Sequence, residues 1–151
     1  MNARSMLLGS MLLSCASAAV AAASDCRPEI VNAWIRAAPP GATTLAGYAN
    51  VRNSCRKQAV LVAVSGVDFG MATLHETRIE SGISKMQHMD ALTIPAGVTA
   101  KLEPGGQHLM LMQPRRELRE GDRTRLTFRL DDGSKVTTDF TVRRQAPKHQ
   151  P

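Results

Sequence analysis

Residues 126–142 read LTFRLDDGSKVTTDFTV, which is two runs of alternating apolar and polar side chains around a short Asp-Asp-Gly segment. In an extended chain Leu126, Phe128 and Leu130 fall on one face, and the second run repeats this alternation after the turn. Asp and Gly are residue types that tight hairpin turns favour. The stretch therefore predicts an antiparallel β-hairpin.

The rest of the chain carries short runs of the same kind and no convincing helical period. Runs rich in Val, Ile, Leu and Thr recur between turn clusters such as Pro104-Gly105-Gly106. We expect strands at about 29–36, 44–54, 58–66, 72–80, 98–103 and 107–113. Strands at this spacing predict an all-β domain, either a β-sandwich or a small barrel of Greek-key type.

The N-terminal segment has the composition of an export signal. Residues 1–23 hold one basic residue, Arg4, then an apolar run, and then small residues before Ser24 that suit signal peptidase. We therefore expect residues 1–23 to be a signal peptide. Lipid attachment at Cys15 is a competing prediction, which we disfavour because the hydrophobic region ahead of this cysteine is so short.

The remaining chain has the length of one domain. We expect residues 24–144 to form an exported β domain and the polar residues 145–151 to form a disordered tail. The apolar run of the signal is too short to cross a bilayer, so we expect no stable membrane insertion. The protein is predicted to be a periplasmic monomer.

The charge of the chain bears on its partners. The formal net charge is +6 and the pI is about 9.8, values that nucleic-acid-binding proteins share. Aromatic residues make up only 3% of the chain, and no basic run is interleaved with stacking side chains, so we expect no nucleic-acid binding. We also find no acid–base pair, nucleophile constellation or open site for a hard metal, and we expect no enzyme activity.

Two cysteines remain once the signal is removed. Cys26 and Cys55 are predicted to pair, because two cysteines in an oxidising compartment usually form a disulfide. Their spacing is far too wide for a redox CxxC motif, which argues against a thiol oxidoreductase.

Methionine and histidine gather in one part of the chain. Beyond the signal, all five methionines lie between residues 71 and 112: Met71, Met86, Met89, Met110 and Met112. Three of the four histidines lie there too: His75, His88 and His108. Residues 107–112 read QHLMLM, so a strand there places His108, Met110 and Met112 on one face and two leucines on the other.

Composition alone leaves two interpretations of this cluster open. Thioether sulfur is a soft neutral donor and imidazole a borderline one, so two of each suit Cu(I) better than zinc, calcium or magnesium. Methionine is also an adaptable core residue, and by default we expect Met71 and Met112 to be core. His88 is then an ordinary hydrogen-bonded histidine, and His149 a solvated residue of the tail.

The spacing of four of these residues resembles that of a known family. Ten residues separate His75 from Met86, twenty-one separate Met86 from His108, and Met110 follows two positions later. This arrangement is similar to the H-x10-M-x21-H-x-M signature of the PCuAC family of periplasmic copper chaperones. The segments around both histidines are similar as well, and the likeness covers nearly the whole chain beyond the signal.

The resemblance implies a cupredoxin-like Greek-key fold and delivery of Cu(I) to the assembly of respiratory cytochrome oxidase. The ligands that it implies are His75, Met86, His108 and Met110. The implied partners are the copper-centre subunit of the oxidase or another copper chaperone. Some relatives bind Cu(II) in a His- and Met-rich C-terminal extension, whereas this chain has only His149 there. Met89 is either a spare thioether near the site or, as we expect, a packing residue.

Two rival functions make different demands on these residues. An electron-transfer cupredoxin needs a Cys thiolate with two His, and Cys26 and Cys55 lie outside the cluster. A metal-free exported β-sandwich would use the Met/His surface as an interaction module and would bind no Cu(I).

Overall fold

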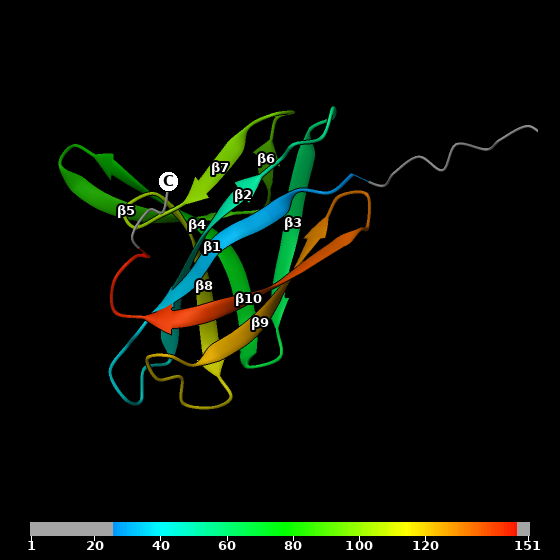
Figure 1. Cartoon of the computed structure of the whole chain (residues 1–151). Helices are drawn as coiled ribbons and strands as arrows, with labels where there is room; N and C mark the ends of the chain where they lie inside the picture. Colours follow the sequence, from blue (N-terminus) through cyan, green and yellow to red (C-terminus); the bar gives the residue numbers. More distant parts are fainter. Residues whose placement is uncertain (1–25, 148–151) are drawn as a thin grey trace, which may run out of the picture.

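The computed structural model describes residues 26–147, which form ten strands and contain no helix (Figure 1). The strands are β1 (Glu29–Arg36), β2 (Thr44–Arg52), β3 (Ala59–Gly66), β4 (Phe69–Glu80), β5 (Ile83–Met89), β6 (Leu92–Ile94), β7 (Thr99–Leu102), β8 (Gln107–Pro114), β9 (Arg123–Leu130) and β10 (Lys135–Arg143). The predicted signal peptide, residues 1–23, and the last residues of the predicted tail lie outside the described range. Within that range no helix has the length and apolar character needed to cross a membrane.

The strands form one sheet that folds around a single core. Their order is β5-β4-β8-β2-β1-β10-β9-β3-β6, and β7 pairs with β2 off this path. Chain neighbours such as β2 and β3 are not paired, whereas β8 returns to lie between β4 and β2, and β10 returns beside β1 in parallel. One hydrophobic cluster draws side chains from strands along the whole path, so the sheet encloses it. This arrangement confirms the predicted all-β, Greek-key sandwich or barrel.

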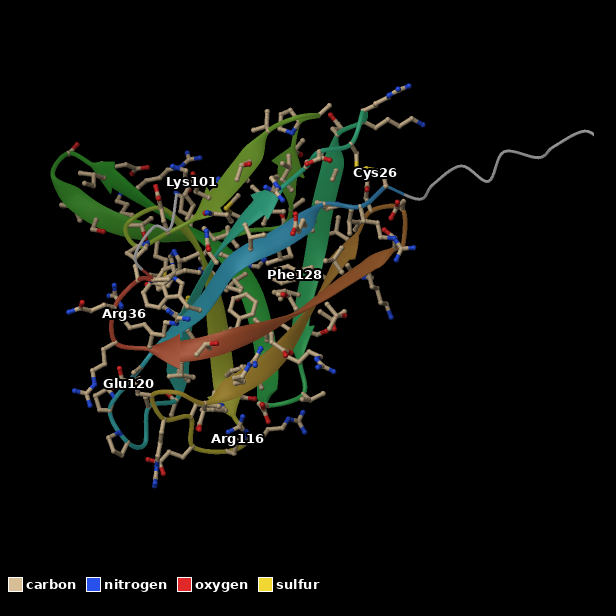
Figure 2. All side chains as sticks on the ribbon, viewed as in Figure 1. Cys26, Arg36, Lys101, Arg116, Glu120 and Phe128 are labelled. Atoms are coloured by element: carbon tan, nitrogen blue, oxygen red, sulfur yellow. A yellow bond between two sulfur atoms is a disulfide. The ribbon has the colours of Figure 1, made fainter. Side chains whose placement is uncertain are left out.

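The hairpin predicted from residues 126–142 is the pair β9–β10. Phe128 lies opposite Val136 and Leu126 lies opposite Thr138. Phe128 and Phe140 are both fully buried, and their ring centroids lie 6.2 Å apart. Figure 2 shows Phe128 inside the ribbon, far from the exposed loop that carries Arg116. Burial of one such ring stabilises the fold by about 1.5–3 kcal/mol.

The structure contains two strands that the sequence did not predict, β5 and β6. Every residue of β5 except Met89 is exposed, so this strand has no apolar alternation to reveal it. It pairs with β4 through seven residue pairs, from Leu74↔Met89 to Glu80↔Ile83. In Figure 1 the β4–β5 hairpin extends from the body of the sheet. Backbone pairing, rather than burial, therefore holds β5 in place.

Side-chain interactions connect neighbouring segments at both ends of the sheet: a disulfide at one end and hydrogen bonds at the other. The predicted disulfide is present and joins Cys26 to Cys55 beyond the end of β2 (Figure 2). At the opposite end Asp68, in the β3–β4 turn, accepts hydrogen bonds from Arg116 Nε at 3.0 Å and Thr124 Oγ1 at 2.6 Å. The hydrogen bond from Arg116, followed by that from Thr124, holds the pKa of Asp68 below its usual value.

Candidate metal centre

Strand β4 lies between β5 and β8 and divides its side chains between two faces. One face turns Leu74 into the core, together with Leu109 and Leu111 of β8. The other face carries His75, because successive side chains of a strand point to opposite sides. This outer face is where the Met/His cluster of the sequence comes together.

Three histidines form a row across the outer face. His75 on β4 lies directly opposite His88 on β5 and directly opposite His108 on β8. The ring centroid of His75 lies 5.3 Å from that of His88 and 6.1 Å from that of His108. The His88 contact is edge-on, and His88 Nε2 also lies 3.5 Å from an Asp90 carboxylate oxygen. His88 thus lies at the surface beside a carboxylate, and it also adjoins the predicted site.

Two of the predicted thioethers flank this row. Met86 on β5 lies opposite Thr77 of β4, one step beyond His75 on the same face. Met110 on β8 lies opposite Thr73 of β4, one step before His75 on the same face. Residues two apart on a strand share a face, so all four predicted ligands belong to one face of three adjacent strands.

Exposure changes steadily across this face. His108 is only 5% exposed, His75 and Met110 are half-buried, and Met86 is 55% exposed. The face therefore has a buried floor at β8 and an exposed rim at β5. An ion on this face would contact the buried His108 on β8 and would still be accessible to solvent beside Met86 on β5.

Hydrogen bonds orient two of the imidazole rings. His108 Nδ1 donates to the carbonyl oxygen of Gly106 at 2.9 Å, so the neutral ring keeps its lone pair on Nε2. His75 Nε2 lies 3.1 Å from Thr73 Oγ1. Within residues 26–147, His75 Nδ1 is buried without a hydrogen-bond partner. A buried nitrogen of this kind costs about 1–3 kcal/mol if nothing pairs with it, so it fits a position that a metal ion completes.

The electrostatics favour the neutral form of the His75 imidazole. Burial lowers the pKa of His75, and the neighbouring rings of His88 and His108 lower it further when they are charged. Neutral imidazole is the form that binds metals. No three His, Cys, Asp or Glu side chains of residues 26–147 are grouped so that they could hold a metal ion. The soft donors that flank His75 on this face are the thioethers of Met86 and Met110.

The remaining methionines divide between the two faces. Met89 packs against the hydrophobic core, which confirms the packing interpretation. The expectation that Met71 is a core residue is wrong, because it lies on the outer face and is 53% exposed. Met112 lies directly opposite Met71, is half-buried, and does not belong to the core cluster either. The alternation that sends Leu109 and Leu111 inward sends Met112 outward. His149 lies outside the described residues.

Comparison of the sequence with known proteins shows a family that matches most of the chain. The model of the family described as "LpqE-like: Putative lipoprotein LpqE-like" matches residues 29–142. "Putative lipoprotein Lxx21020" of Leifsonia xyli subsp. xyli (strain CTCB07) is 36% identical over 107 residues, which cover 70% of this chain and 63% of that protein. "Uncharacterized protein RP573" of Rickettsia prowazekii (strain Madrid E) is 29% identical over 101 residues, which cover 66% of this chain and 56% of that protein. The chain thus spans about three fifths of these curated relatives.

Solved structures share the fold. The copper-bound PCuAC domain from PmoF2 has a TM-score of 0.65 and 26% identity, covering 80% of this chain and 94% of that domain. The solution structure of CuI-DR1885 from Deinococcus radiodurans has a TM-score of 0.64 and 28% identity, covering 82% of this chain and 83% of that one. Apo-DR1885 has a TM-score of 0.62 and 28% identity, covering 95% and 97%. The resemblance to PCuAC domains predicted from the His and Met spacing is confirmed.

Proposed function

The chain belongs to the LpqE-like family, and from this membership, its PCuAC-like fold and the chemistry of its outer face we propose that it is an exported Cu(I) carrier. In this proposal four side chains hold one Cu(I): His75, Met86, His108 and Met110. The metal is the cargo of the protein, which takes it up and gives it to an acceptor. Two structures that share the fold at above 25% identity are described as copper-bound or CuI forms, which supports this choice of metal.

The observation that carries the proposal is the position of the two imidazoles and two thioethers. His75 and His108 lie directly opposite each other in adjacent strands, and Met86 and Met110 flank them one step away on the same face. His75 Nδ1 is buried without a hydrogen-bond partner among the described residues, so its lone pair is available to bind a ligand. No carboxylate or thiolate is part of the set, so its donors are soft or borderline and neutral, as Cu(I) prefers.

The same set suits transfer rather than permanent storage. A neutral His2Met2 site holds Cu(I) without the strong charge attraction of thiolates. Met86 lies at the exposed rim, where an incoming ligand of an acceptor protein would first meet the ion. We infer that the acceptor is the copper-centre subunit of a respiratory cytochrome oxidase or another copper chaperone.

The location that we propose is the periplasm. An N-terminal segment of signal-peptide composition and similarity to proteins described as putative lipoproteins both support export. We favour cleavage near Ser24 over lipid attachment at Cys15, because the small-residue site before Ser24 follows the apolar run at a suitable distance.

A competition titration against a Cu(I) chelator tests the proposal. We expect one Cu(I) to bind the purified protein tightly enough to compete with the chelator, and we expect His75→Ala, His108→Ala, Met86→Leu and Met110→Leu each to weaken this binding. Met89→Leu is the matched control, because Met89 lies on the same strand as Met86 but packs against the core. If the protein took up no Cu(I), the metal-free interaction module would replace the carrier. If the four variants bound Cu(I) as tightly as Met89→Leu, then His75, Met86, His108 and Met110 would not be its ligands.

A further inference from the structure

A second group of sulfur atoms adjoins the proposed site on the same face. Met71 on β4 lies directly opposite Met112 on β8, and the next pair along the two strands is Thr73 and Met110. Met71, Met110 and Met112 therefore occupy neighbouring positions of one face, and we refer to these three residues as the thioether patch. The patch continues the outer face beyond Met110, on the side away from His75.

Packing does not account for the thioether patch. On these strands the side chains that enter the core include Leu74, Leu109 and Leu111, and the last two are fully buried. None of the three patch methionines belongs to the core cluster or to the partly buried residues packed against it. Met71 leaves more than half of its surface in solvent, with 53% exposed. An apolar side chain kept outside the core in this way forgoes the free energy of burial.

The spacing of the patch brings its sulfur atoms within reach of one another. Directly opposite residues of an antiparallel pair have Cβ atoms about 4.5–5.5 Å apart, and diagonal neighbours about 7–8 Å apart. Met71 and Met112 are opposite neighbours, while Met71 and Met110 are diagonal neighbours. Methionine has three rotatable bonds before its methyl group, so three such side chains can direct their sulfurs to one point.

The residues directly opposite Met110 and Met112 on their neighbouring strands, apart from Met71, are uncharged. Met112 lies opposite Thr44 on its other side, and Met110 lies opposite Thr73 and Ala46. A site of thioethers alone selects soft monovalent ions with a filled d shell and discriminates against divalent ions that need charged or oxygen ligands.

We propose that Met71, Met112 and the shared Met110 form a second, weaker site that binds Cu(I) or Ag(I) through sulfur alone. The role of this site rests on the proposed function: Met110 belongs to both ligand sets, so it links the His75–His108 pair to the exposed Met71. An ion moves between the two sites by exchange of one thioether at a time, with no change of oxidation state. The second site binds more weakly because it has no imidazole and lies nearer to solvent.

A titration with Ag(I), a redox-inert substitute for Cu(I), tests this site by NMR of protein labelled with 13C in its methionine methyl groups. We expect the first equivalent to shift the Met86 and Met110 signals. We expect the second, bound by Met71 and Met112 while Met110 stays with the first ion, to shift those of Met71 and Met112. In the double variant Met71→Leu/Met112→Leu we expect the stoichiometry to fall from two to one, with the first equivalent bound as in the native protein. Leucine has nearly the volume of methionine, so this variant should keep its fold. Met89→Leu should still bind two equivalents.

The variant His75→Ala/His108→Ala separates the two proposals. We expect it to lose the first binding event while the Met71 and Met112 signals still shift. A native protein that binds one equivalent and leaves the Met71 and Met112 signals unmoved would overturn the second site and leave the carrier function standing. A native protein in which only Met71 and Met112 respond would support the second site and contradict the His2Met2 site.

Discussion

Strands β4 and β8 have two faces that differ in chemistry, although the same chain segments build both. The inner face carries leucine side chains that pack in the core. Leu74 is 4% exposed, and Leu109 and Leu111 are fully buried. The outer face of the same strands carries histidine and methionine, from buried His108 to exposed Met71. The period of two along a strand assigns each residue to one face or the other. Close packing of the inner face therefore fixes the positions of the ligands on the outer face, and stability and metal binding should respond to different mutations.

The largest expected effect comes from a matched pair of neighbours on opposite faces. Leu109→Ala should lower the free energy of unfolding by about 2–5 kcal/mol, because it leaves a cavity in the core. Met110→Ala should cost only about 1 kcal/mol, as for a typical residue outside the core. Urea denaturation measures both.

Cu(I) affinity should show the reverse order for this pair. Folded Leu109→Ala should bind Cu(I) as the native protein does. Met110→Ala should lose at least as much affinity as the roughly 10–100-fold that follows loss of a group supporting a metal ligand. Equal losses of affinity in the two variants would show that the faces do not act separately.

The disulfide offers a second separation of stability from metal binding. The Cys26–Cys55 bond spans a sequence separation of 29 residues and lies outside the Met/His face. Replacing both cysteines by serine should lower the free energy of unfolding by about 2–4 kcal/mol, since the bond restricts the unfolded chain. Cu(I) affinity of the folded protein should be unchanged. Thermal unfolding and the chelator titration measure the two quantities, and free thiols in protein isolated from the periplasm would contradict the assignment.

Asp68 allows a test in which pH changes stability without involving the ligands. Its pKa is lowered from the usual 3.8 by the hydrogen bonds from Arg116 and Thr124, so the ionised form is stabilised in the folded protein. Asp68→Asn should cost about 1–2 kcal/mol at neutral pH, at or below the lower end of the range for hydrogen bonds to a charged group, because the Arg116 side chain is partly exposed to solvent.

The sign of the pH dependence follows from the lowered pKa. The contribution of Asp68 is complete above its unfolded pKa and is lost as pH falls through its folded pKa. The stability difference between native protein and Asp68→Asn should therefore be constant near neutrality and shrink below about pH 4. Denaturation curves recorded at several pH values measure it. A difference that grew as pH fell would contradict the assignment.

The smallest of these effects is expected at Thr73. A lone pair on His75 Nδ1 requires the proton on Nε2, which then donates to Thr73 Oγ1 at 3.1 Å. Thr73→Val removes this acceptor with little change of volume and should weaken Cu(I) binding by about tenfold, as loss of a positioning partner does. Thr77→Val, on the same strand and face, is the control and should leave affinity unchanged. Equal behaviour of the two variants would show that Thr73 does not orient the ring.

The sequence predicted most of the fold because most strands are half-buried. Alternation of apolar residues located β9 and β10, and short runs between turn clusters located β1, β2, β3, β4, β7 and β8 to within a few residues. Strand β5 was missed because its residues are exposed on both faces, apart from Met89 at its end. Hydrophobic periodicity reports burial, so it cannot reveal a strand held by backbone pairing alone.

The missed strand explains what the sequence could predict of the site. The faces of β8 followed from alternation, which placed His108 and Met110 together. The positions of Met86 and His88 depend on the register of β5 against β4, which no local pattern encodes. Met71 was predicted to be a core residue because methionine is usually buried. In the structure Met71 lies two residues before Thr73 on β4 and therefore on the same outer face.

Copper K-edge X-ray absorption of the Cu(I)-loaded protein tests the account most directly, because it counts the atoms bound to the metal. With one equivalent of Cu(I) we predict two nitrogen and two sulfur neighbours, and loss of one sulfur neighbour in Met86→Leu. A first shell of nitrogen and oxygen alone, or one unchanged by that substitution, would contradict the claim that the outer face of β4, β5 and β8 holds the metal.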